Sequence, residues 1–197
     1  MRLLLISCLG TSLAVCSIPV RAQGQKQKGP SQTASEGGDG NKTELRNNSA
    51  SLLADLLGQE KEVSKILIIK HNSAELGRLM KAISQTAGDG VKRLEELARQ
   101  DSSLDLHALQ LPPGEKATRA AITKTEEHDL LLTSGLEFEL NLLLTQTQAL
   151  SYGSHLAKVA AENSPTRAET REFHSLDVAL QELFHQVVLQ IRALPRK

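Results

Sequence analysis

Residues 126–161 read EEHDLLLTSGLEFELNLLLTQTQALSYGSHLAKVAA. The stretch contains no proline, and its apolar residues recur at steps of three, four and seven, at Leu136, Leu140, Leu143, Leu150 and Ala157. This spacing places an apolar stripe along one face of a helix. A helix of this length cannot bury its stripe alone, so the pattern predicts a long central helix in a helical bundle.

The composition of the 197-residue chain supports a core of aliphatic side chains. Hydrophobic residues make up 40% of the chain but aromatic residues only 2%, so the core must be built from Leu, Ile, Val and Ala. Aromatic platforms for stacking bases or sugars are therefore not expected. Lys and Arg together number 23, as do Asp and Glu, so no overall positive charge attracts nucleic acid.

Residues 1–22 have the pattern of a secretory signal peptide. Arg2 is followed by an apolar run over residues 3–18, and Val20-Arg21-Ala22 is a small-x-small cleavage site. The run is shorter than the roughly 20 residues that span a bilayer, so no transmembrane span is expected after cleavage. We therefore expect a periplasmic or secreted protein. Both cysteines lie within this signal, so the mature chain would have no thiol nucleophile or thiolate metal ligand.

The remaining chain divides into a polar linker and a helical domain. Residues 23–50 are rich in Gly, Gln and Ser, which predicts a disordered linker. Residues 51–194 are predicted to form the bundle, beginning with a short helix over 51–57 that ends at Gly58. A helix over 59–87 is expected to stop at Gly88-Asp89-Gly90, and another follows over 91–100.

Proline residues mark the later boundaries. Leu111-Pro112-Pro113-Gly114 is the clearest break, and a helix resumes over 115–133 with a kink expected at Ser134-Gly135 before the central helix. Asn163-Ser164-Pro165 ends the central helix, and a last helix is predicted over 165–194. No alternating β-branched run indicates a sheet, so the predicted fold class is all-α.

Three short segments together resemble a known family. They are residues 74–79 (AELGRL), residues 91–101 (VKRLEELARQD) and residues 134–139 (SGLEFE). Their order resembles the bacterial exported family called domain of unknown function 4142, whose members are ferritin-like helical bundles often described as outer-membrane proteins. The resemblance covers about residues 62–191 and implies an antiparallel four-helix bundle. The chain departs from the family at Ser102 and Leu150, where the family typically has histidine.

Metal binding is the sharpest chemical hypothesis for such a bundle. Di-iron bundles use inward carboxylates and Glu-x-x-His pairs, whose members share one helix face. Glu182 and His185 form such a pair, but their helical angle directs them away from Leu180 and toward water. The other candidate ligands for a divalent metal are Glu75, Asp101 and Glu139. The leading hypothesis is a non-catalytic structural or binding module without a cofactor, and a ferritin-like metal-binding protein is the alternative.

The sequence supports no named reaction. It has no Gly-x-Ser-x-Gly elbow, and its serines lie in expected caps and linkers. Small residues at Ser151, Gly153, Ser154, Ala157, Ala160 and Ala161 allow close helix approach, either within one chain or between copies. We therefore expect a non-enzymatic module of the cell envelope whose partner is an unknown envelope protein or another copy of the chain.

Overall fold

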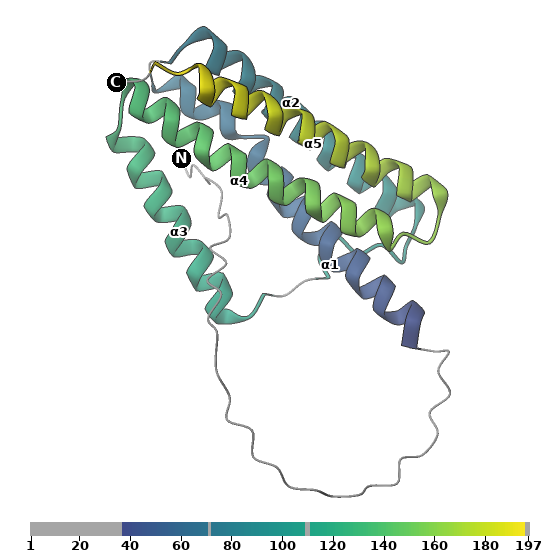
Figure 1. Cartoon of the computed structure of the whole chain (residues 1–197). Coiled ribbons are helices and arrows are strands. Elements are labelled where there is room, and N and C mark those ends of the chain that lie inside the picture. Colours follow the sequence, from purple (N-terminus) through teal and green to yellow (C-terminus); the bar gives the residue numbers. More distant parts are fainter. Residues whose placement is uncertain (1–36, 71, 109–110, 196–197) are drawn as a thin grey trace, which may run out of the picture.

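The computed structural model describes residues 37–70, 72–108 and 111–195, and the regular elements in these ranges are all helices (Figure 1). The all-α prediction is therefore confirmed. In chain order the elements are α1 (Gly37–Glu60), the short 3-10 helix η1 (Val63–Ile68), α2 (Ala74–Gln100), α3 (Pro113–Leu132), α4 (Gly135–Glu162) and α5 (Arg167–Ala193). The predicted signal peptide, and the part of the predicted linker before Gly37, lie outside the described residues.

Four of the helices form a closed ring of contacts. The helix α1 packs on α4 and α2, and α5 packs on α4 and α2, so the core lies between the four. Its buried side chains are mainly aliphatic, as the composition predicts, and include Leu53, Leu57, Leu94, Leu150, Leu176 and Leu180. The helix α3 meets α4 at one end of the molecule and then diverges from it (Figure 1).

The helix α1 corrects the predicted boundary between linker and domain. It begins at Gly37, well inside the segment predicted to be disordered, and it continues through Gly58 to Glu60. Glycine and asparagine are weak helix formers, so local propensity argues against a helix here. Tertiary contacts explain the helix from Arg46 onward, because Arg46, Ser49 and Ala50 are all buried against the rest of the bundle, whereas residues 39–45 are exposed.

The helix α2 also differs from its prediction. The Gly88-Asp89-Gly90 segment was expected to end a helix, but α2 runs through it without interruption. A Cβ atom at Gly90 would lie 2.8 Å from Leu57 Cδ1 and 3.2 Å from Leu176 Cδ2. Glycine therefore permits a close approach of α1 and α5 to α2 at this point. The predicted helix over 59–87 is instead broken, and α2 begins at the Ser73 cap, whose side chain accepts a hydrogen bond from the Leu76 backbone N–H.

The stretch predicted as one central helix is divided between α3 and α4. The break falls at Thr133 and Ser134, and Gly135 has a φ of 59°, in the left-handed region that favours glycine. The apolar stripe changes accordingly, because Leu136 and Leu140 are 39% and 37% exposed. The residues of the stripe after Leu140 are buried: Leu143, Leu150 and Ala157.

The breaks at proline are close to their predicted places. The helix α3 begins at Pro113, and α4 has Asn163 as its C-cap. The last helix begins at Arg167 rather than at Pro165, because the Thr166 side chain accepts a hydrogen bond from the Glu169 backbone N–H and caps it.

The small residues of α4 serve packing within the chain. A Cβ atom at Gly153 would lie 2.9 Å from Leu56 Cδ2 and 3.1 Å from Leu180 Cδ1. The Ser154 hydroxyl donates a hydrogen bond of 2.6 Å to the buried Asp177 carboxylate on α5. The small face therefore lets α1 and α5 approach α4 closely.

Substitution of two helical glycines by alanine should have opposite effects on stability. Gly58→Ala, with nothing within 4 Å of the added Cβ, should stabilise the protein by about 0.5–1 kcal/mol through helix propensity. Gly153→Ala gains the same propensity but displaces Leu56 and Leu180, and overpacking costs typically about 1–3 kcal/mol. Urea unfolding should place the midpoint of the wild type between those of the two variants. Equal stabilisation by both substitutions would contradict the close packing described for Gly153.

Candidate functional site

The first polar cluster in the bundle surrounds Arg46 of α1, whose side chain is only 1% exposed. Its Nη1 atom lies 2.9 Å from Asp101 Oδ2 and 3.2 Å from Glu169 Oε2, and its Nη2 atom donates to Ser103 Oγ at 2.9 Å. Asp101 is the C-cap of α2, and Glu169 lies in the first turn of α5. One guanidinium therefore joins α1, the segment after α2 and the start of α5.

The two carboxylates around Arg46 have different environments. Hydrogen bonds from the Ser103 hydroxyl and backbone N–H, with a smaller contribution from Arg46, lower the pKa of Asp101 to about 2. Burial raises the pKa of Glu169, and the neighbouring Asp101 raises it further against the opposing charge of Arg46. Asp101, a candidate metal ligand by sequence, is thus engaged in a structural ion pair.

The second polar cluster contains Glu60, Gln146 and Glu126, which come from α1, α4 and α3. Glu60 is 2% exposed and Gln146 is fully buried. Both carboxylate oxygens of Glu60, both amide atoms of Gln146 and Oε2 of Glu126 are buried without a hydrogen bond of ordinary geometry to any described residue. Buried polar atoms are normally paired, so five such atoms on three neighbouring side chains mark this cluster as unusual.

Burial also shifts the titration of the two carboxyl groups. The pKa of Glu60 is raised to about 8, mainly by burial. The Gln146 amide opposes this rise, and the negative charge of Glu126 adds to it. Burial raises the pKa of Glu126 to about 7. The influence of Gln146 and Glu126 on Glu60 shows that the three side chains lie close enough to interact.

The residues nominated by sequence do not assemble into one site. Glu75 is exposed and pairs with Arg78 of its own helix at 3.0 Å, and Glu182 and His185 are also exposed. Glu139 is buried, but it accepts hydrogen bonds from the Ser73 backbone N–H at 2.6 Å and hydroxyl at 3.0 Å, which secures the start of α2. In the described ranges, no three His, Cys, Asp or Glu side chains form a group that could hold a metal ion.

Sequence reasoning missed the cluster of Glu60, Gln146 and Glu126, although a signal was present. Gln146 lies three residues after Leu143 and four before Leu150, on the apolar stripe of α4. Glu60 likewise lies three residues after the apolar Leu57, on the same side of α1. A polar residue on a buried stripe could have indicated the cluster, although it could not have shown that Glu126 joins it.

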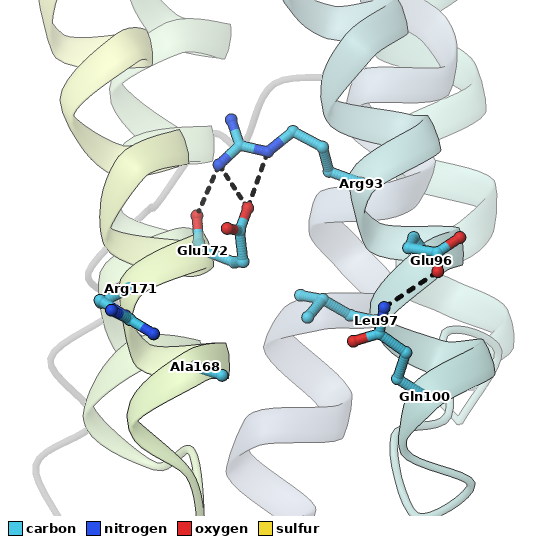
Figure 2. Close-up of a pocket in the computed structure, with 7 residues that line it drawn as sticks. All are labelled: Arg93, Glu96, Leu97, Gln100, Ala168, Arg171 and Glu172. Atoms are coloured by element: carbon cyan, nitrogen blue, oxygen red, sulfur yellow. Dashed lines mark hydrogen bonds and ion pairs between the residues drawn. The ribbon is translucent and has the colours of Figure 1, made fainter.

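A groove of about 500 Å³ lies between α2 and α5 (Figure 2). Arg93 reaches across from α2 to α5 and donates to the Glu172 carboxylate from Nε at 2.9 Å and from Nη2 at 2.6 Å. Leu97 and Ala168 supply the apolar part of the lining. Arg93 is thus paired across the groove, which favours a role in joining the two helices.

One end of the molecule carries exposed aliphatic side chains. Lys70 Nζ donates to the backbone carbonyls of Leu131 at 2.6 Å and Thr133 at 2.8 Å, which brings the segment after η1 beside the break between α3 and α4. Five exposed aliphatic residues lie at the end of η1 and around the break between α3 and α4, and we name them the apolar end surface: Ile68 (83% exposed), Ile69 (51%), Leu131 (51%), Leu132 (72%) and Leu136 (39%).

These features define a helical bundle with two polar clusters inside it and an apolar surface at one end. No protein-family model, no curated protein sequence and no solved structure matches the chain. Across the described helices, none has an apolar stretch long enough to cross a membrane.

Removal of the Arg46 charge should destabilise the protein strongly. Arg46→Met leaves the buried Glu169 carboxylate without its partner, and breaking a buried pair costs typically about 3–5 kcal/mol. Arg78→Met, which removes an exposed cation, is the matched control and should leave the urea midpoint essentially unchanged. Adding Glu169→Gln to Arg46→Met should recover part of the loss, and the absence of any recovery would show that the charge of Glu169 is not the cause.

The raised pKa of Glu60 should make the wild type less stable as pH rises. The folded state retains a proton on Glu60 between about pH 4.5 and 8 that the unfolded chain has released, so stability falls by up to about 1.4 kcal/mol per pH unit in that window. Glu60→Gln should match the wild type near pH 5 and exceed its stability above pH 8.

Urea unfolding in chelator-containing buffer at several pH values measures this effect, with Glu182→Gln as an exposed control that should follow the wild type. Parallel pH profiles of the wild type and Glu60→Gln would contradict the assignment of the pH dependence to Glu60.

Proposed function

We propose that the protein is an exported, non-catalytic helical-bundle module of the cell envelope, and that it binds a second copy of itself through the apolar end surface. The observation that carries this proposal is the concentration of exposed Ile and Leu side chains at one end of the bundle. Large contiguous apolar patches on a folded surface mark interaction sites, because leaving them in water is unfavourable.

A second copy of the chain is the occupant that the chemistry favours. Aliphatic side chains such as Ile68 and Leu132 carry no charge or directional group, so an identical patch complements them in a two-fold dimer. The equal numbers of acidic and basic residues also mean that two copies do not repel each other through a large net charge. The patch contains five aliphatic residues, fewer than the roughly 20–30 residues that each partner contributes to a standard interface, so we expect weak, concentration-dependent association.

The proposed location rests on the N-terminal sequence. Arg2, the apolar run and the Val20-Arg21-Ala22 cleavage pattern together favour export to the periplasm or the exterior. After cleavage, the residues from 23 to 36 would connect the new N-terminus to α1.

We further propose that α1, α2, α4 and α5 form an antiparallel bundle of the ferritin-like type, as the resemblance to domain of unknown function 4142 implies. The ring of contacts among these four helices supports this arrangement. In this proposal α3 is an additional helix between the second and third members of the bundle.

Charged substitutions should test the proposed dimer. Ile68→Glu combined with Leu132→Glu should weaken self-association of the mature chain, residues 23–197, at least tenfold, because each dimer would bury like charges. Val178→Glu combined with Leu189→Glu alters two apolar residues of α5 that are also exposed but lie outside the patch, and this control should associate like the wild type. Sedimentation velocity over a range of concentrations measures the association.

A monomeric wild type at every concentration, or an equal loss of association in the control, would overturn the proposal. Flotation with vesicles of phosphatidylethanolamine and phosphatidylglycerol distinguishes the other occupant. If the monomer bound these vesicles through Ile68 and Leu132, a lipid surface would replace the second copy as the occupant of the patch.

A further inference from the structure

The cluster of Glu60, Glu126 and Gln146 combines two carboxyl groups with an amide inside the protein. Glu60 is the last residue of α1, Glu126 lies on α3 and Gln146 lies in the middle of α4. The Gln146 amide and the Glu126 charge both act on the Glu60 carboxyl, so the three side chains lie near one another although they come from three helices. The Glu60 and Gln146 side chains are 2% and 0% exposed, so water does not reach them freely.

The unpaired atoms of this cluster point to a ligand. Glu60 Oε1 and Oε2, Glu126 Oε2 and Gln146 Oε1 are four buried oxygens that accept no hydrogen bond of ordinary geometry from the described residues. The side chains that act on the Glu60 carboxyl are Gln146, which is neutral, and Glu126, which is acidic. Neither supplies a positive charge to pair with a Glu60 carboxylate. Burying carboxylate oxygens without a compensating partner is costly, and paired charges or bound metals are the usual compensation.

Gln146 adds a buried neutral group to the acidic pair. Its amide is completely buried, and neither its oxygen nor its nitrogen makes a hydrogen bond of ordinary geometry in the described part of the chain, although the amide lies near enough to the Glu60 carboxyl to lower its pKa. An apolar residue would fill the same position on the α4 stripe without this loss. The amide oxygen is a neutral ligand of the kind that accompanies carboxylates around hard cations.

We propose that Glu60, Glu126 and Gln146 bind one divalent cation of the hard class, such as Ca²⁺, Mg²⁺ or Mn²⁺. All the available donors are oxygens, which these cations prefer, and two carboxylates balance the charge of the ion. The set differs from the residues that the sequence nominated, since it contains no histidine and uses an amide.

The proposed ion would also attach α3 to the rest of the molecule. Because Glu126 belongs to α3 while Glu60 and Gln146 belong to α1 and α4, coordination would link the diverging helix to two members of the bundle. Anything that binds the folded state alone stabilises it, so the ion should protect the amide protons of α3 against hydrogen exchange.

Titration of the metal-free mature chain with Mn²⁺, Ca²⁺ and Mg²⁺ separately tests the site. Isothermal titration calorimetry at mildly alkaline pH should show one ion per chain for at least one of these metals. Glu60→Gln, Glu126→Gln and Gln146→Leu should each weaken that affinity at least tenfold, because each removes a ligand. Glu75→Gln and Glu182→Gln remove exposed carboxylates and should bind as the wild type does.

Hydrogen exchange provides the second measurement and shows whether each variant is folded. The ion should slow exchange in Pro113–Leu132 of the wild type, while Glu60→Gln should keep its core protection and show no slowing with metal. Absence of binding by the wild type to all three ions would overturn the site. Equal affinity, or equal protection of α3, in the wild type and Glu60→Gln would overturn it as well.

Discussion

The position of α1 depends on the buried guanidinium of Arg46. Aliphatic contacts such as those of Leu53 and Leu57 are non-directional and tolerate small shifts of one helix along another. A buried charge tolerates no such shift, because it must meet Asp101 and Glu169 together to offset its loss of hydration. The ion pairs therefore fix the register of α1 against α2 and α5, while the apolar core supplies most of the free energy of folding.

The sequence predicts the fold class and the breaks at proline, because these depend on local chemistry. The break at Pro112-Pro113 follows from the geometry of proline alone, whereas the role of a glycine depends on its neighbours. Gly90 lies inside a helix beside Leu57 and Leu176, and Gly135 begins a helix with a positive φ. The placement of Arg46 inside the bundle could not be predicted, because it depends on partners that lie far along the chain.

The candidate site was less predictable than the fold. Glu75, Asp101 and Glu139 were nominated by their resemblance to a family pattern, but their contacts with Arg78, Arg46 and Ser73 explain them as parts of the structure. Gln146 and Glu60 were visible as polar residues on apolar stripes. Their meeting with Glu126 depends on how α3 lies against α1 and α4, and a sequence pattern does not determine how one helix is placed against another.

The separation of Arg46 from Glu169 by 123 positions also bears on the order of folding. The helices α4 and α5 are joined by the short connection between Asn163 and Thr166, so this helical hairpin can form from local contacts. The helix α1 is synthesised before the others, but its charged partner Glu169 follows Arg46 by 123 positions. The contacts of Arg46 therefore form only after the start of α5 has been made. An unfolded chain is the form that passes through a membrane pore, so this delay would suit the proposed export.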